Sequence, residues 1–392
     1  MTPHPKSWLD AWHVAPSASR DYDFIDGLRG VAILLVVACH LVYVNPNANQ
    51  LVLLVGGVFS AGTFGVTVFF ALSGFLISLP FWKRKRENFP NSIPPGYGWR
   101  RFWKIYPPLA LSLLLLTPIY FFRTGEFSFF LTMLKWLTGL PVVLPPKGHL
   151  NPVMWSLIVE VHFYMILPAF FLLFKKLRFK YCLVLIPSIF LFVPLCFRIA
   201  TGLYAPTLTL SPNIDVHFPA LLDSFALGIF VAGLHTAGWL SLGWAKLGSA
   251  GFLILALCFI GQSCIQLWPF LPEGLAAELL HTLVLIASGL LLLYVANPDR
   301  RLGRYLAHPL LRWFGLISYE WYLFHQPVIL WARSSFGPAN GIMWKYLLIL
   351  GGPFLFSLVF SALVYRYFSL PILKYGRNRT SLNSPRMNHV SA

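Results

Sequence analysis

Long apolar segments, separated by short polar connections, run through almost all of the 392-residue chain. A helix that crosses a bilayer needs ~20 predominantly apolar residues. The pattern predicts an all-α fold, a polytopic helical bundle of about ten transmembrane helices plus one re-entrant or interfacial segment. The expected spans are residues 28–45, 58–81, 103–123, 152–174, 181–200, 217–237, 246–268, 275–296, 309–332 and 343–369.

Lys and Arg are distributed unevenly between the loops. The loops at 82–102, 175–180 and 297–308 and the C-terminal tail are basic, whereas the loops at 46–57 and 201–216 contain no Lys or Arg. Cytoplasmic loops of membrane proteins carry the excess of Lys and Arg. We therefore expect the basic loops and both termini to be cytoplasmic.

The apolar stretch 128–144 is shorter than the others and is bounded by Gly and Pro residues. Because an even number of crossings must separate two cytoplasmic loops, we expect this stretch to be re-entrant or interfacial, on the outer side. Non-helical backbone at membrane depth is tolerated where it lines a protein cavity. The expected organisation is a cytoplasmic arm at 1–27, a transmembrane domain at 28–369 and a cytoplasmic tail at 370–392.

The composition supports an integral membrane protein. Hydrophobic residues make up 57% of the chain and charged residues 11%, against ~25% charged in soluble domains. The net charge of +17 is expected to face anionic membrane lipid on the cytoplasmic side, not nucleic acid. The five cysteines form no C-x-x-C pair and show no Cys-His zinc spacing, so we expect no metal. The predicted location is the cytoplasmic (inner) membrane, in multi-pass form.

The first span carries an arginine and a histidine on one face. Asp26 is a candidate N-cap, and Arg29 and His40 follow it within the apolar run. At about 100° and 1.5 Å per residue, eleven steps place His40 roughly 16 Å above Arg29 and roughly 20° away in direction. An intramembrane histidine indicates a functional site. The alternative is a histidine that only packs against a neighbouring helix.

Basic residues also enter the third span. Arg101 and Lys104 are three residues apart and share a helix face, and Arg100 precedes them. Such a cationic face suits phosphate groups. In the second span, Ser73 next to Gly74 indicates either close helix packing or contact with a substrate.

The fourth span contains a carboxylate, Glu160. It lies about 8 residues, or ~12 Å, from the expected outer end of its helix, which places it at the level of His40 in a ~30 Å hydrocarbon core. A carboxylate beside a neutral imidazole fixes its tautomer and stabilises the imidazolium that forms on proton transfer. We therefore predict that Glu160 holds His40 as a general base.

Aromatic residues and a second histidine are further candidates for substrate contacts. Trp155 and Tyr164 flank Glu160, and the ninth span contains Tyr319 and His325. The aromatic residues of the ninth span either belong to an interfacial belt or line a sugar site. His325 lies near the expected outer end and is a candidate for contact with an acceptor.

Five segments together resemble the membrane-bound acyltransferase family 3. They span residues 22–327 and match the family's signatures in order, except that Lys104 replaces the second arginine of Arg-x-x-Arg, which removes a bidentate grip there. The segments are Asp26-Gly-Leu-Arg29 through His40, Phe69-Phe70-Ala-Leu-Ser-Gly-Phe-Leu-Ile, Arg101-Phe-Trp-Lys104-Ile-Tyr-Pro, Trp155-Ser-Leu-Ile-Val-Glu160-Val-His-Phe-Tyr164 and Ile317-Ser-Tyr-Glu-Trp-Tyr-Leu-Phe-His325-Gln-Pro.

The resemblance implies an O-acyltransferase that moves an acyl group, expected to be acetyl, from cytoplasmic acyl-CoA to a hydroxyl of a cell-surface or secreted glycan. It implies His40 as catalytic base or acyl relay, and Arg29 and Arg101 as contacts of the donor. Arg100, Lys104 and Ser73 are further expected donor contacts. Acyl-CoA is expected as a donor substrate, with no tightly bound cofactor, and a free or lipid-linked glycan as the acceptor. Polysaccharide-assembly proteins are possible partners.

Two other functions are consistent with the same residues. A proton-coupled secondary transporter would use His40, Glu160, Asp223 and Glu320 as proton-carrying groups. A structural component of a polysaccharide export complex would not depend on His40. Acyl-CoA consumption distinguishes the enzyme from both.

Overall fold

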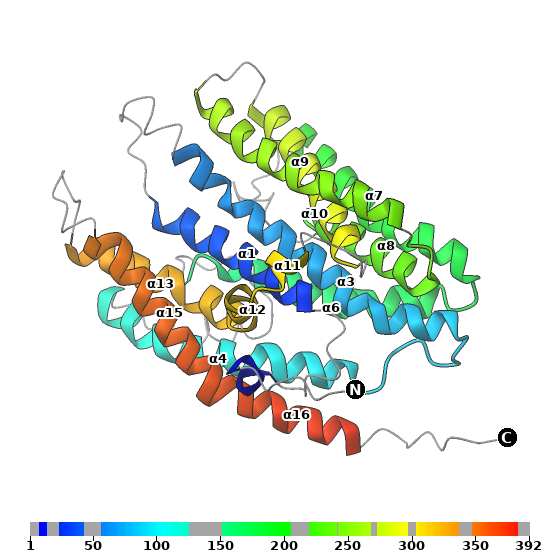
Figure 1. The fold of residues 1–392 in the computed structure, drawn as a ribbon, viewed down its shortest axis with the longest axis horizontal. Helices are drawn as coiled ribbons and strands as arrows, with labels where there is room; N and C mark the ends of the chain where they lie inside the picture. The colour runs from blue at the N-terminus through cyan, green and yellow to red at the C-terminus, as the bar shows by residue number, and fades with distance from the viewer. Residues whose placement is uncertain are drawn as a thin grey trace.

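The computed structural model describes most of the chain, and every regular element in the described part is helical (Figure 1). The described residues are 8–13, 23–42, 56–124, 151–204, 219–240, 242–267, 273–296, 303–336 and 347–382. The predicted re-entrant stretch 128–144 lies outside them.

The helices follow the predicted apolar segments closely. In chain order they are η1 (Trp8–Trp12), α1 (Asp23–Leu41), η3 (Ala61–Thr63), α3 (Phe64–Arg86), α4 (Tyr97–Thr124), α6 (Met154–Leu173), α7 (Phe179–Tyr204), α8 (Asp223–Ala237), α9 (Leu242–Leu267), α10 (Glu273–Val295), α11 (Gly303–Leu306), α12 (Pro309–Leu316), α13 (Ser318–Phe336), η6 (Leu347–Gly351), α15 (Gly352–Val364), η7 (Tyr365–Ser369) and α16 (Leu370–Leu382).

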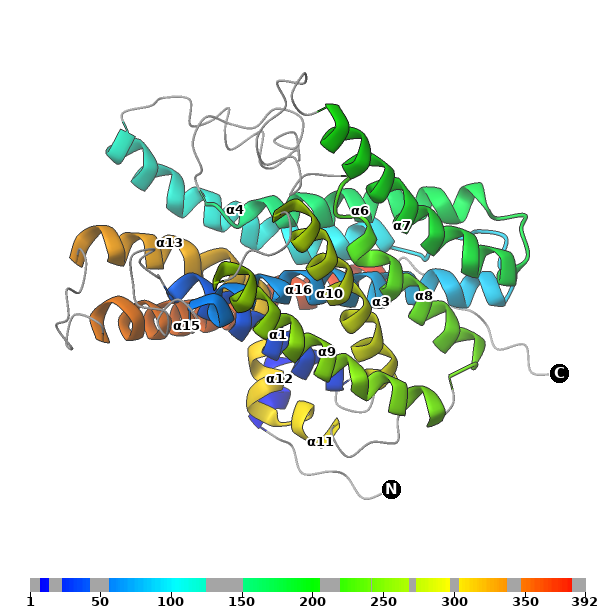
Figure 2. The same cartoon turned by 90° about the horizontal axis from the view of Figure 1, so that it is seen from above.

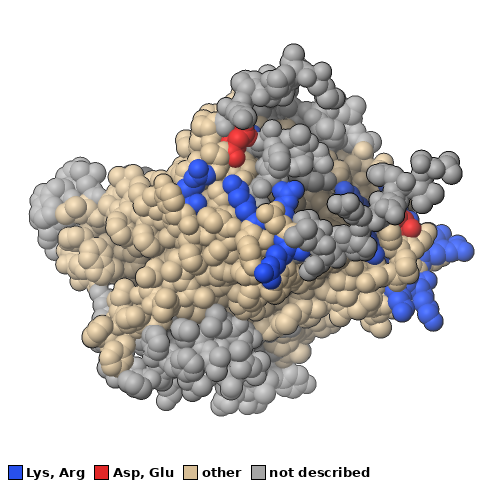
Figure 3. Space-filling model, turned by 90° about the horizontal axis from the view of Figure 1, so that it is seen from below, with Lys and Arg blue, Asp and Glu red and all other residues tan. Residues whose placement is uncertain are grey.

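Six helical segments of the described chain are long and apolar enough to cross a membrane. Their surface is consistent with lipid contact, because large apolar side chains such as Phe122 and Leu173 are 84% and 71% exposed. Figure 3 shows a face that is mostly uncharged, with Lys and Arg gathered near its middle and at one side and little Asp or Glu. The six segments are Phe24–Leu41, Gly56–Arg86, Tyr97–Ile119, Met154–Leu173, Phe179–Ala200 and Leu348–Arg379.

The predicted single span at 309–332 is wrong, because the helix breaks there. α12 ends at Leu316, and α13 begins at Ser318 in a different direction (Figures 1 and 2). The Ser318 hydroxyl donates to the Gly315 carbonyl at 2.7 Å, and such side-chain bonds compete with regular helix bonding. The break leaves α12 packed against α1, and α13 runs beside α1 and α15.

Helix α1 lies at the centre, between α3, α12 and α13 (Figure 1). Glycines permit its close approach to α12: a Cβ on Gly30 would collide with the Leu311 carbonyl oxygen, and one on Gly315 with the Asp26 carbonyl oxygen. α3 and α8 approach similarly, because a Cβ on Gly74 would strike the Phe225 carbonyl. These contacts fix the position of α1, and therefore that of Arg29 and His40.

Candidate active site

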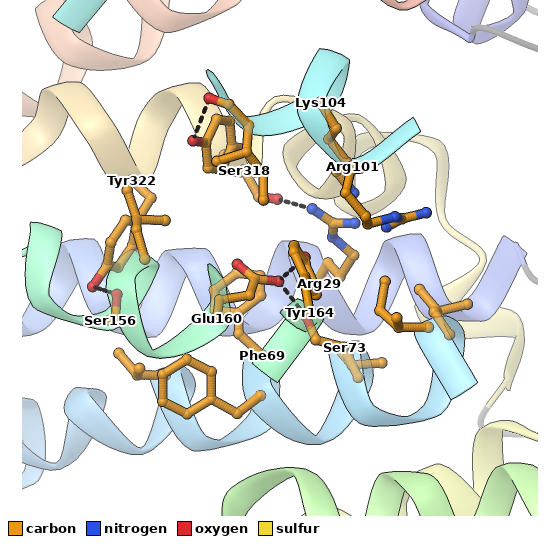
Figure 4. A pocket seen from close by; sticks show the side chains of 18 residues that line it. Arg29, Phe69, Ser73, Arg101, Lys104, Ser156, Glu160, Tyr164, Ser318 and Tyr322 are labelled. Atoms are coloured by element: carbon orange, nitrogen blue, oxygen red, sulfur yellow. Dashed lines mark hydrogen bonds between the residues drawn. The ribbon is translucent and has the colours of Figure 1, made fainter. Parts of the chain in front are cut away.

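A cavity of about 300 Å³ lies between α1, α3, α4, α6 and α13 (Figure 4). We call it the basic cavity, since three basic side chains and one carboxyl group line it. Five helices that are distant in sequence each contribute at least one polar side chain. The polar and aromatic lining residues are Arg29, Phe69, Phe70, Ser73, Arg101, Lys104, Ser156, Glu160, Tyr164, Ser318, Tyr319 and Tyr322.

Glu160 is held by two hydroxyl groups. The Ser73 hydroxyl donates to Glu160 Oε1 at 2.6 Å, and the Tyr164 hydroxyl, one turn further along α6, donates to the same oxygen. Gly74 has the packing role considered from the sequence, because it lets α8 approach. Ser73 bonds to Glu160 in the wall of the basic cavity, and its contact with a substrate stays a prediction.

Hydrogen-bond and ring contacts position the arginines of the basic cavity, and no ion pair among the described residues neutralises them directly. Arg29 Nη2 donates to the Ser318 hydroxyl at 3.1 Å, and the guanidinium of Arg101 lies 5.7 Å from the centre of the Tyr164 ring. In the described residues, the Nε atoms of both arginines are buried without a hydrogen-bond partner. Buried donors without partners are costly, so this cavity is suited to an anionic ligand.

His40 contacts a second histidine, His325, instead of Glu160. His325 Nδ1 lies 3.0 Å and 2.9 Å from the carbonyl oxygens of Trp321 and Tyr322, so this nitrogen carries the proton and donates to them. His325 Nε2 is then an acceptor, and His40 Nδ1 lies 3.1 Å from it and 2.9 Å from the Val36 carbonyl oxygen. His325 Nε2 and the Val36 carbonyl oxygen are both acceptors, so the proton of the neutral His40 ring lies on Nδ1. His40 Nε2 is therefore unprotonated and can act as a base.

The predicted direct support of His40 by Glu160 is therefore wrong for the described residues. Glu160 bonds to Ser73 and Tyr164, and His40 bonds to His325 and Val36. Equal depth of His40 and Glu160 along their helices does not imply contact, because depth does not fix the lateral distance between the two helices. His325 supplies the orienting contact that was assigned to the carboxylate.

A second cavity, of about 480 Å³, is lined by His40 and is called the histidine chamber. Trp155, a predicted substrate contact, lines this chamber together with residues of α8, α9 and α10. Val66, Phe70 and Tyr322 line both the histidine chamber and the basic cavity, so the two spaces are adjacent and share a wall.

A third cavity of about 300 Å³ continues from the other end of the basic cavity. Arg29, Lys104 and Tyr319 line both, and His13 and Asp26 add residues from the N-terminal part of the chain. The three spaces form a series from the N-terminal elements to His40. The helix geometry of α1 gives this series a length of roughly 16 Å between Arg29 and His40.

The structure separates the remaining predicted site residues. Tyr164 and Tyr319 lie in the basic cavity and not with His40, and the Tyr319 hydroxyl donates to the Ile105 carbonyl at 2.9 Å. Arg100 is exposed, lines none of the three cavities, and donates to the Pro95 carbonyl at 2.6 Å. Its predicted contact with the donor has no support in this geometry.

Several site residues were missed by sequence reasoning. Ser318 holds Arg29, and Ser156 bonds to the Tyr322 hydroxyl at 2.7 Å, at the wall between two cavities. Arg333 Nη2 donates to the carbonyl oxygens of His40 and Leu41 at 2.7 and 3.0 Å, at the end of α1. Ser318 lies inside the motif that contains His325, and Ser156 lies inside the motif that contains Glu160, so these motifs were the available signal. Arg333 follows the predicted span 309–332 directly, and no sequence signal beyond its charge marked it as a site residue.

Comparisons with known proteins show the family of this chain. A family model described as an acyltransferase domain matches residues 22–366. The peptidoglycan O-acetyltransferase OatA of Listeria monocytogenes is 26% identical over 385 residues, covering 90% of this chain and 56% of that protein. The acyltransferase MdmB of Streptomyces mycarofaciens is 29% identical over 167 residues, covering 39% of this chain and 40% of that protein.

The chain spans about half the length of the curated relatives that it matches along most of its own length. No solved structure matches it.

Proposed function

We propose that this chain, which belongs to the acyltransferase domain family, is a membrane O-acetyltransferase that moves an acetyl group from acyl-CoA to a hydroxyl of a glycan. One observation carries the proposal above the others. A cavity with three basic side chains adjoins, through a shared wall, a chamber in which a histidine has an available basic nitrogen. A donor with phosphates and an acceptor with hydroxyls require those two environments.

The basic cavity suits the donor. Arg29 and Arg101 have buried Nε–H groups without partners, and Lys104 lies in the same wall. Phosphates accept charge-assisted hydrogen bonds from such groups, and arginine presents a planar fork that matches them. The phosphates of acyl-CoA bind at these residues, and the acyl thioester extends along α1 toward His40.

The reaction uses the nitrogen of His40 that the hydrogen bonds leave as an acceptor. His40 Nε2 takes the proton from the acceptor hydroxyl as its oxygen attacks the thioester carbonyl carbon. The carbon–sulfur bond breaks, the ester forms, and the CoA sulfur takes the proton back from His40. His325 keeps the tautomer and ring orientation of His40, and Arg333 holds the end of α1 through backbone carbonyls.

The orientation follows from the loop charges. Basic loops at 82–102 and 175–180 place the Arg29 end of the site on the cytoplasmic side, where acyl-CoA is found, and the histidine chamber toward the outer side. Ten crossings of the membrane, with both chain termini in the cytoplasm, are consistent with this orientation. The location is the cytoplasmic membrane. The relatives named as peptidoglycan O-acetyltransferases support a cell-wall or other surface glycan as the acceptor.

The test is acetyl transfer by purified protein from labelled acetyl-CoA to an oligosaccharide. His40→Ala should abolish transfer, because His40 Nε2 is the base of the proposed reaction. His162→Ala is the matched control: His162 bonds to the Ile158 carbonyl of its own helix at 2.7 Å and lines none of the three cavities. Equal transfer by wild type and His40→Ala would refute the proposal.

A further inference from the structure

A cluster of ionisable side chains joins α7, α8 and α10 beside the histidine chamber. Arg198 Nη1 lies 2.9 Å from Asp223 Oδ2, and Arg198 Nε lies 3.0 Å from Glu278 Oε1. His281 Nε2 lies 3.0 Å from the same Asp223 oxygen. None of these four residues has a part in the acetyl transfer described above.

The hydrogen bond to Asp223 determines which ring nitrogen of His281 donates and which accepts. A carboxylate accepts a hydrogen bond, so His281 donates from Nε2, and its other ring nitrogen is an acceptor when the ring is neutral. Asp223 is only 2% exposed, and buried ion pairs by themselves contribute little net stability. The carboxylate, held by Arg198, orients a histidine that lines the chamber.

A second observation points to a ligand at the same wall. Ser224 follows Asp223 on α8, lines the chamber and is 1% exposed. Its hydroxyl is buried without a hydrogen-bond partner in the described residues. Gln262 of α9 also lines the chamber and adds an amide group. A hydroxyl, an amide and an acceptor nitrogen are the groups that recognise sugar hydroxyls.

The described residues that line the chamber are not Lys, Arg, Asp or Glu, in contrast to the basic cavity. The chamber also has an aromatic face, which Trp155 supplies. Its volume of about 480 Å³ lies within the ~300–1,000 Å³ range of small-molecule sites. This chemistry fits one or two neutral sugar units and provides no counter-charge for an anionic one.

We propose that His281, Ser224 and Gln262 form a binding subsite for a neutral sugar unit of the acceptor, next to the unit that receives the acetyl group. His281 accepts a hydrogen bond from a sugar hydroxyl, and Asp223 and Arg198 act as positioning residues for His281. The inference rests on the proposed function, since it identifies the occupant of the chamber that His40 serves.

The experiment measures acetyl transfer from acetyl-CoA to a neutral chitooligosaccharide and to the same oligosaccharide bearing carboxymethyl groups. Asn at position 281 is too short to keep the hydrogen bond to Asp223 that orients the acceptor atom, so His281→Asn should raise the KM for the neutral oligosaccharide about tenfold. The kcat and the KM for acetyl-CoA should remain unchanged. Wild type should prefer the neutral over the carboxymethylated oligosaccharide.

The control is His235→Asn, the same change on α8 at a histidine that lines none of the three cavities. It should leave all constants unchanged. Gln262→Met, which keeps the side-chain length and removes the amide, should also raise the KM for the neutral oligosaccharide, and tests the subsite if His281→Asn does not accumulate in membranes.

If wild type is active and the KM for the neutral oligosaccharide is the same in wild type, His281→Asn and Gln262→Met, this inference is overturned and the proposed function is left intact. A preference for the carboxymethylated oligosaccharide would overturn it as well. A wild type that transfers acetyl to neither oligosaccharide would instead contradict the proposed function.

Discussion

The direction of three hydrogen bonds determines what His40 can do. The carbonyl oxygens of Trp321 and Tyr322 accept from His325 Nδ1, and His325 Nε2 accepts in turn from His40 Nδ1. A chain of this kind sets the tautomer of a catalytic histidine without a carboxylate. In the proposed reaction His325 is a positioning residue, because its effect on the substrate passes through His40.

His325→Leu should lower kcat by about 10²-fold or more, the usual contribution of a correctly presented general base, with the KM for acetyl-CoA unchanged. His325→Gln can present an amide oxygen to His40 Nδ1 and should retain more activity. Steady-state kinetics of both variants provide the measurement. Equal losses in the two would show that His325 only fills space.

The basic cavity leads to a separate prediction about the donor. Arg29→Ala and Arg101→Ala should each raise the Kd for acetyl-CoA by about 10- to 100-fold, because each removes charge-assisted hydrogen bonds of about 1.5–3 kcal/mol. Arg100→Ala is the control, since Arg100 is exposed and bonds to the Pro95 carbonyl. Calorimetric titration of acetyl-CoA measures all three. An Arg100 effect as large as that of Arg101 would contradict the assignment.

Sequence spacing predicted some residue positions and not others. The shared face of Arg29 and His40 follows from a continuous helix, and α1 runs unbroken from Asp23 to Leu41. The partner of His40 could not be derived in this way, because His325 lies 285 positions away. The distance between two helices depends on how the whole bundle packs, and no local pattern encodes it.

At the scale of elements, the close approach of α1 and α12 positions the site. Pro309 begins α12, a favourable first position because its missing N–H has no partner there anyway. The long apolar segments predicted the helices well, because a backbone within a membrane must satisfy its own hydrogen bonds and a helix does so. It did not predict the break between α12 and α13, which depends on the Ser318 side chain bonding to the Gly315 carbonyl.

Gly30→Ala should destabilise the protein by about 1–3 kcal/mol, the typical cost of overpacking, because the added Cβ would meet the Leu311 carbonyl. It should also lower acetyl transfer, since α1 carries Arg29 and His40. Gly98→Ala is the matched control: a Cβ there meets nothing within 4 Å. Thermal unfolding in detergent measures both, and an equal Tm for the two variants would contradict the packing argument.

At the scale of the whole molecule, the three cavities form a series along α1, and the proposed orientation directs that series across the membrane. The N-terminal elements and Arg29 lie toward one end, and His40 toward the other. Residues on α3, α4, α6 and α13 complete the walls, so the site exists only in the assembled bundle. This explains why no single motif of the sequence was sufficient to describe it.

The orientation is tested with reporter fusions. A reporter that works only in the cytoplasm should be active when it is placed in the loop at 82–102 or after residue 392. A reporter that works only outside the cytoplasm should be active in the loops at 46–57 and 201–216. Loop charge is the physical reason. An outer location of the 82–102 loop would reverse the proposed sides of donor and acceptor.

The central claim is that His40 lies where a donor from one side meets an acceptor on the other, and vesicles reconstituted with the full chain test it most directly. Labelled acetyl-CoA is supplied outside, and a chitooligosaccharide is trapped inside. The account predicts labelled, acetylated oligosaccharide inside vesicles of wild type and His162→Ala, and none in vesicles with equal amounts of His40→Ala. Label on the trapped oligosaccharide at the wild-type rate in His40→Ala vesicles would contradict it.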